Sequence, residues 1–169
     1  MPDDSPASDA RLRDGAAWRE EAPRLFRGRG SFGNGAAMRA APIGAFFAIV
    51  ACRADRATLL ETVVRYTPPG NVLARLERAA RIPLHADPVQ VGDALGTGFD
   101  IAAHDTVPFC LWVAARHLDS YEEAIWTATS QPGDRDTNGA IVGGIVVLAT
   151  SVDRIPVLWR AATEPLPVP

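Results

Sequence analysis

Oxygen-bearing side chains crowd into one short stretch towards the C-terminal end of the sequence. Residues 133–139 read GDRDTNG and place two carboxylates, Asp134 and Asp136, beside the hydroxyl of Thr137. Hard divalent cations such as Mg²⁺ and Mn²⁺ prefer carboxylate and hydroxyl oxygens, so these three side chains are candidate metal ligands. In the alternative interpretation Asp136 only caps the helix that follows, and Asp134 faces solvent. The spacing alone leaves both interpretations open.

The same stretch matches the first half of a calcium-binding EF-hand loop. Asp134, Asp136, Asn138 and Gly139 satisfy the first four side-chain requirements of such a loop. The loop must end on a bidentate carboxylate, but Ile145 stands at that position and the residues before it are apolar. The sequence therefore excludes a calcium loop of this type.

A second candidate site is the glycine-rich stretch GRGSFGNG at residues 28–35. Its glycines would let backbone amides approach an anion, Ser31 and Asn34 would add hydrogen bonds, and Phe32 would stack on a ring. The first six residues fit the dinucleotide fingerprint, but residues 22–26 contain a proline and make a poor preceding strand, so we do not expect a Rossmann unit. An ordinary loop with a buried Phe remains the alternative.

Composition narrows the class of protein. The net charge of -3 provides no basic stripe for general nucleic-acid binding. No apolar run reaches the roughly 20 residues of a membrane span, and the acidic N-terminus does not resemble a signal peptide. Cys52 and Cys110 lie in apolar runs, as reduced core thiols do, and the three dispersed histidines do not have zinc-site spacing. We expect a cytoplasmic protein that binds neither nucleic acid nor membranes.

The elements that must position these residues are predicted to be helical. Apolar residues recur at helical spacing, and no stretch alternates cleanly with period two. The run at residues 140–149 is apolar on every side, which is typical of a helix in the centre of a core, and the four tryptophans are also expected there. The sequence therefore predicts an all-α fold, with helices over residues 38–52, 55–66, a segment capped by Asn71, a short segment ending at Leu95, 106–117, 121–130, 140–149 and 155–161.

The chain is expected to hold one domain. Residues 1–16 mix Asp, Ser, Pro and Ala and are predicted to be a disordered lead-in. Residues 163–169, TEPLPVP, hold three prolines and should end the fold as an extended tail. Residues 17–162 remain for the helical domain.

The order of several segments resembles one family. GSFGNGAAMRAAPIGAFFA is followed by ALGTGFDIAAHDTVPFCLWVAA, YEEAIWTA, GDRDTNGAIVGGIV and IPVLW. This order is similar to that of the ADP-ribosylglycohydrolase family, which includes dinitrogenase reductase-activating glycohydrolases and ADP-ribosyl-protein hydrolases. The resemblance covers roughly residues 17–162 and implies an all-α orthogonal helical bundle.

The resemblance also implies a site and a reaction. Two divalent ions, Mg²⁺ or Mn²⁺, would lie at a D-x-D-[TS] motif that corresponds to Asp134 and Asp136, the implied catalytic residues, with Thr137 as a further ligand. The implied binding segment for the ribose and phosphates of ADP-ribose consists of Ser31, Phe32, Gly33, Asn34 and Gly35. The implied reaction is hydrolysis of the bond between C1 of the distal ribose and a protein side chain. The ions would hold ribose hydroxyls and a water, while the carboxylates stabilise oxocarbenium-like charge.

The sequence also departs from the family pattern. The family motifs G-D-x-x-G and T-D-D, whose carboxylates complete the metal cluster, do not precede GSFGNG, and a helix with a T-H-x-x-P-like signature is missing after A-P-x-G. About three oxygen ligands remain, whereas Mg²⁺ needs six. We therefore expect a truncated member with weak or absent catalysis, whose uncovered apolar faces favour self-association or a partner chain. The alternative is an inactive remnant that acts as an ADP-ribose-binding or protein-interaction module.

Overall fold

The computed structural model describes residues 10–11, 13–21, 33–35, 37 and 56–164, and contacts divide the chain into two units, residues 1–32 and 33–169. In the first unit, α2 (Trp18–Glu21) ends on the buried Glu21, whose carboxylate accepts a hydrogen bond from Arg11 Nε at 2.7 Å. The predicted helix at 38–52, which includes Cys52, lies outside the described residues, as do Ser31, Phe32 and the side chain of Trp18. The limits predicted for the lead-in and the tail stay predictions.

The second unit is a helical bundle, which confirms the predicted all-α class. Within the described ranges the only extended pairing is an isolated antiparallel bridge between Gly33 and Ala102. No helix in these ranges combines the length and hydrophobicity that crossing a bilayer requires. The helices are α5 (Arg56–Tyr66), α6 (Asn71–Arg81), α7 (Pro88–Leu95), α8 (Ala103–Arg116), α9 (Tyr121–Ser130), α10 (Arg135–Thr150), the 3-10 helix η2 (Val152–Arg154) and α11 (Val157–Ala161).

Polar side chains fix where several of these helices begin. Asp87 caps α7 by accepting a hydrogen bond from Val89 N, and Ser120 caps α9 by accepting one from Glu123 N. The predicted cap at Asn71 is wrong, because Gly70 holds the N-cap position of α6 and makes no side-chain bond. Asn71 is instead the first helical residue, so the turn before α6 depends on glycine geometry.

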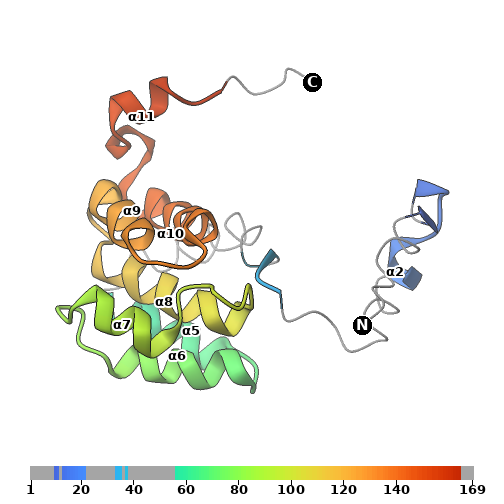
Figure 1. Cartoon of the computed structure of the whole chain (residues 1–169), viewed down its shortest axis with the longest axis horizontal. Coiled ribbons are helices and arrows are strands. Elements are labelled where there is room, and N and C mark those ends of the chain that lie inside the picture. Colours follow the sequence, from blue (N-terminus) through green and yellow to red (C-terminus); the bar gives the residue numbers. More distant parts are fainter. Residues whose placement is uncertain (1–9, 12, 22–32, 36, 38–55, 165–169) are drawn as a thin grey trace. The chain divides into compact units, whose positions relative to one another are not determined.

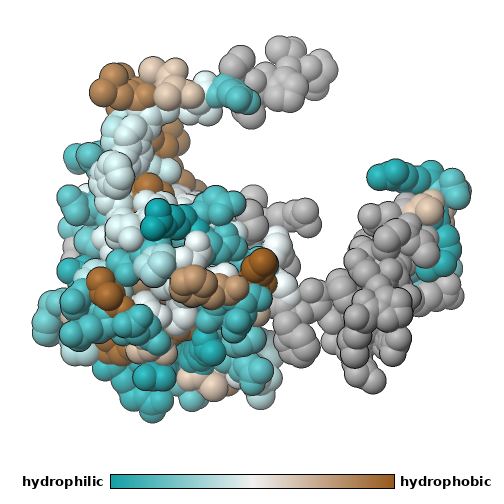
Figure 2. All heavy atoms as spheres, in the orientation of Figure 1, coloured by the Kyte–Doolittle hydropathy of each residue, from teal (hydrophilic) through white to brown (hydrophobic). Residues whose placement is uncertain are grey.

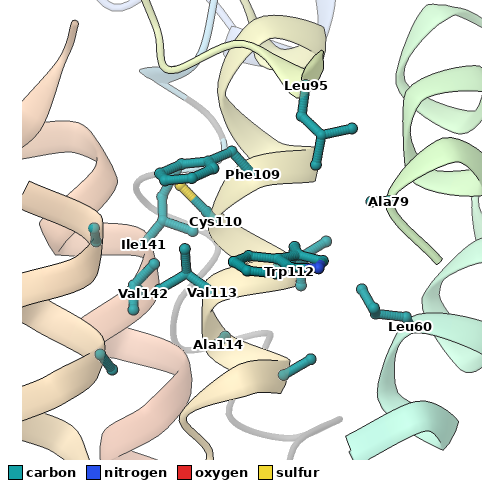
Figure 3. Packing of buried hydrophobic residues seen from close by; sticks show 14 of the residues in the cluster. Leu60, Ala79, Leu95, Phe109, Cys110, Trp112, Val113, Ala114, Ile141 and Val142 are labelled. Carbon is teal, nitrogen blue, oxygen red and sulfur yellow. The ribbon is translucent and has the colours of Figure 1, made fainter. Parts of the chain in front are cut away.

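Helix α8 is the centre of the core. It contacts α5, α6 and α7 on one side and α9 and α10 on the other (Figure 1). Trp112 points towards Leu60 and Ala79, whereas Val113 faces Val142 on α10 (Figure 3). Because both faces of α8 are covered, Trp112 and Val113 are fully buried, as are Phe109, Cys110, Ala114 and Ala115.

The boundaries of α8 and α10 differ from the prediction. Helix α8 begins at Ala103 rather than at residue 106, so Pro108 lies in the second turn and not the first. Helix α10 begins at Arg135 rather than Ala140, because Asp134 supplies its cap. Only one face of α10 is fully buried, so the expectation that it is covered on every side is wrong.

The tryptophans divide between core and surface. The prediction of a core residue is confirmed for Trp112, but Trp126 is 57% exposed and Trp159 is half-buried. Trp159 makes edge-to-face contacts with Trp126 and Tyr121, at centroid distances of 5.8 and 6.4 Å. Hydrophobic surface also gathers over α11, at the upper left of Figure 2. Aromatic contacts therefore join α11 to α9 at the surface of the bundle.

Candidate functional site

Three segments that are distant in the sequence meet at the N-terminus of α10. They are Gly33–Asn34, the loop between α7 and α8 at residues 96–102, and the turn before α10 at residues 133–134. The second is called the 96–102 loop below. Backbone and side-chain hydrogen bonds join the three segments, and Asp134 takes part in the bonds to both of the others.

Asp134 is the N-cap of α10. Its Oδ1 accepts a hydrogen bond from Thr137 N at 3.3 Å, and its own backbone N–H donates to the Thr97 carbonyl at 3.0 Å. The alternative interpretation of the sequence had Asp136 as the cap and Asp134 facing solvent. The structure reverses these roles, because Asp134 is the cap and Asp136 is exposed in the first turn of the helix. Asp134 therefore lies at the N-cap of α10 and Asp136 in its first turn.

The surroundings of Asp134 favour its ionised form. Burial alone would raise the pKa of this carboxyl, but hydrogen bonds with Thr137, Asn34 and the Asp136 side chain together outweigh burial and hold the pKa below its ordinary value. The N-terminal end of α10 also favours negative charge. At neutral pH the site consequently presents an anionic carboxylate with a second carboxyl group in hydrogen-bonding range.

Asn34 links the glycine-rich stretch to this carboxylate. It is buried, and its Nδ2 donates to Asp134 Oδ2 at 2.9 Å and to Thr106 Oγ1 at 3.3 Å. Its backbone N–H donates to the Ile101 carbonyl at 3.1 Å. The two stretches singled out in the sequence therefore touch across a separation of 100 residues. Of the other predicted binding residues, Gly33 and Gly35 are exposed beside Asn34.

Two glycines allow the 96–102 loop to approach the start of α10. Gly98 has φ +95°, and a Cβ at this position would lie 2.6 Å from the Cβ of Asp134. Gly133 has φ +108°, and a Cβ at this position would overlap the Thr97 carbonyl oxygen. Both positions combine a left-handed backbone with a contact too close for any side chain, so the local geometry requires glycine.

Asn138 is a site residue that the sequence analysis missed. It is fully buried, its Nδ2 donates to the Thr97 carbonyl at 2.9 Å, and its Oδ1 accepts a hydrogen bond from Cys110 Sγ at 3.3 Å. In the sequence it stood out only as a residue of the excluded calcium loop. The signal that would have found it is its spacing of one helical turn from Asp134, which places both on one face of α10.

The donor atoms fit a hard divalent cation in type. Asp134, Asp136 and Thr137 offer carboxylate and hydroxyl oxygens, which are the ligand atoms that such an ion prefers. This set of candidate ligands is small. In the described ranges, no group of three or more His, Cys, Asp or Glu side chains lies close enough together to hold a metal ion. An ion at this position would need water or ligand oxygens for the rest of its coordination.

Comparison with known proteins gives one match. The family model described as ADP-ribosylglycohydrolase matches residues 48–167, which is more than half of the chain. The matched range includes α5 to α11 and so Asp134, Asp136 and Thr137, whereas residues 31–35 precede it. No curated protein and no solved structure matches the chain.

Proposed function

Because the chain belongs to the ADP-ribosylglycohydrolase family, we propose that it hydrolyses the glycosidic bond between ADP-ribose and a protein side chain with the help of a divalent cation. The hydrogen bond from Asn34 to Asp134 carries this proposal. It joins a glycine-rich segment suited to ribose and phosphate with a pair of carboxylates suited to Mg²⁺ or Mn²⁺. A cytoplasmic location, consistent with the free thiol of Cys110, is part of the same proposal.

In this proposal Asp134, Asp136 and Thr137 hold the cation, and the two carboxylates stabilise positive charge that develops on the distal ribose. When bound, the ion supplies Lewis-acid polarisation of the oxygens that coordinate it. Asn34 fixes the orientation of Asp134 through its amide. Gly33 and Gly35 leave their backbone open to the substrate. Ser31 and Phe32 are proposed as further substrate contacts from the sequence alone.

A second candidate function is binding without catalysis. The observation that favours it is the small donor set, since two carboxylates and one hydroxyl provide about half of the six ligands of Mg²⁺. A site of this kind would retain ADP-ribose through the glycine-rich segment but would hold the ion weakly. The protein would then be an ADP-ribose-binding or protein-interaction module.

Calorimetric titration of the full chain with Mn²⁺ and with ADP-ribose tests the site. We expect wild type to bind both, and Asp134→Asn to lose Mn²⁺ binding while remaining folded, because Asn is as good an N-cap as Asp but carries no charge. The matched control is Asp87→Asn, which makes the same change at the cap of α7 and should bind Mn²⁺ as wild type does. Folded wild-type protein that binds neither ligand would overturn both the hydrolase and the ADP-ribose-binding module, and would leave only the protein-interaction module.

Turnover separates the two functions. Release of ADP-ribose from peptides modified on arginine or serine, measured with and without Mn²⁺, should occur with wild type and vanish in Asp134→Ala and Asp136→Ala. Ligand binding without any release would favour the binding module. Release that persists at the wild-type rate in both variants would show that these carboxylates are not catalytic.

A further inference from the structure

Asp105 joins the 96–102 loop to the bundle at several points. It lies in the first turn of α8 and is 7% exposed. Its Oδ2 accepts a hydrogen bond from Asp100 N at 3.1 Å, and its backbone carbonyl accepts one from Gly98 N at 2.9 Å. At Gly96, with φ +90°, a Cβ would overlap Asp105 Oδ1, so the carboxylate packs directly on the loop backbone.

Arg75 completes this arrangement from α6. Its Nη1 donates to Asp105 Oδ1 at 3.1 Å and to the Leu95 carbonyl, at the end of α7, at 3.0 Å. The guanidinium side chain is 36% exposed, whereas that of Asp105 is only 10% exposed, so the buried carboxylate depends on this cation for its charge balance. Arg75 therefore links α6 to the end of α7, where the 96–102 loop begins, and to Asp105 in the first turn of α8, just after the loop ends.

The loop held in this way is the one that positions Asp134. The Thr97 carbonyl accepts the Asp134 backbone N–H at 3.0 Å and Asn138 Nδ2 at 2.9 Å. The loop is also strained, since Ile101 has φ +51°, a conformation that costs energy for a β-branched residue and persists only when its surroundings enforce it. Ile101 in turn accepts the Asn34 N–H.

We propose that Arg75 and Asp105 are positioning residues of the candidate site, which act through the 96–102 loop to set the orientation of Asp134. Neither residue is needed as a ligand. Their removal would free the Thr97 carbonyl to move, and the cap of α10 would lose its fixed partner. The consequence for cation binding rests on the proposed function, but the consequence for the Thr97–Asp134 hydrogen bond does not.

Amide hydrogen exchange tests the structural step without any ligand. In Arg75→Ala and in the milder Asp105→Asn, exchange at the Asp134 amide should accelerate relative to the Val142 amide, which lies in the core of the same helix. The ratio cancels any general loss of stability. The matched control is Arg116→Ala, which removes bonds to the Leu84 and Ala86 carbonyls at the other end of α8 and should leave the ratio unchanged.

Calorimetric titration with Mn²⁺ tests the functional step. Partners that orient metal ligands typically change affinity by about 10-fold to 100-fold, so both variants should bind Mn²⁺ more weakly by that factor and Arg116→Ala should not. Arg75→Lys, which keeps the charge, should restore part of the loss. An exchange ratio at Asp134 that moves no more than in Arg116→Ala would overturn the proposal. A moved ratio in a protein whose wild type binds no Mn²⁺ would support the positioning and reject the cation site alone.

Discussion

The carboxylate of Asp134 combines two roles that the sequence presented as alternatives. As the N-cap of α10 it accepts a hydrogen bond from Thr137 N, and as an anion beside Asp136 it is suited to a cation. The roles are compatible because a carboxylate has more lone pairs than one capping bond uses. One residue can therefore be both a helix cap and a metal ligand. Substitutions of Asp134 have to distinguish the effect of its charge from the effect of its capping hydrogen bond.

The contribution of Asp134 to the free energy of unfolding should come from its capping hydrogen bond and not from its charge. Asp134→Ala removes the cap and should lower the free energy of unfolding by about 1 kcal/mol, as N-cap losses typically do. Asp134→Asn keeps an acceptor for Thr137 N and should cost clearly less. Urea unfolding at neutral pH measures both values. Equal losses in the two variants would show that charge, through Asn34 and the helix dipole, matters more than the cap.

The thiol of Cys110 should make stability fall at high pH. Burial, and secondarily the charge of Asp134, raise its pKa far above the ordinary value of 9.0, so the native state keeps this proton where the unfolded state releases it. The folded state therefore loses stability as pH rises above that value, by up to about 1.4 kcal/mol per pH unit. Urea unfolding between neutral pH and about pH 10 should show a steeper fall for wild type than for Cys110→Ala. Parallel curves would contradict the assignment.

The site depends on contacts between the 96–102 loop and the turn at residues 133–134, and these contacts involve backbone atoms. The Thr97 carbonyl receives the N–H of Asp134 and the amide of Asn138. Gly98 and Gly133 make this approach possible, since each lies against the opposite segment. The geometry of the first turn of α10 therefore depends on the 96–102 loop as well as on α10 itself.

Gly98→Ala should disrupt this contact. Its added Cβ would meet the Cβ of Asp134 in a left-handed backbone conformation, so the variant should lose at least about 2 kcal/mol of stability and displace the carboxylate. The matched control is Gly35→Ala, at a neighbouring segment where an added Cβ meets nothing within 4 Å. Thermal unfolding measures both, and a similar effect of the two substitutions would argue against the close approach.

The sequence predicted the helices better than it predicted their starts. Apolar spacing placed α5 and α9 almost to the residue, because their polar flanks contain turn residues or a Ser cap. Helix α10 was expected only from Ala140, because Asp, Thr, Asn and Gly have low helix propensity and resemble a loop. Tertiary contacts from Thr97 and Asn34 stabilise that first turn, and no local pattern encodes them.

The candidate site was predictable only in part for a related reason. Asp134, Asp136 and Thr137 stand out by residue type, whereas the Thr97 carbonyl has no side-chain signature. The contact of Asn34 with Asp134 spans 100 residues, so only the resemblance to a family connected the two stretches beforehand. Arg75 and Asp105 were missed because an ion pair between separate helices has no short-range spacing in the sequence.

Among the described residues of the second unit, large apolar side chains lie both in the core and on the surface. Around α8 the large apolar side chains are enclosed, with Phe109 and Trp112 fully buried. In contrast, large apolar side chains are exposed on α9 and α11, where Trp126 is 57% and Leu158 82% exposed. Contiguous apolar surface of this kind commonly marks an interaction site. We therefore propose the exposed apolar side chains of α9 and α11 as the contact surface for the expected self-association.

Self-association should therefore depend on α11. We expect wild type to associate with rising concentration in sedimentation velocity, and Leu158→Glu to weaken association at least about tenfold, since a buried charge costs more than the 1.4 kcal/mol that tenfold represents. Leu158 is 82% exposed, so the substitution should leave the fold intact. The matched control is Val89→Glu on α7, where an apolar side chain is 53% exposed. Wild type that stays monomeric at every concentration, or equal effects of the two substitutions, would exclude α11 as the contact, and the protein would then act as a monomer or with a partner bound elsewhere.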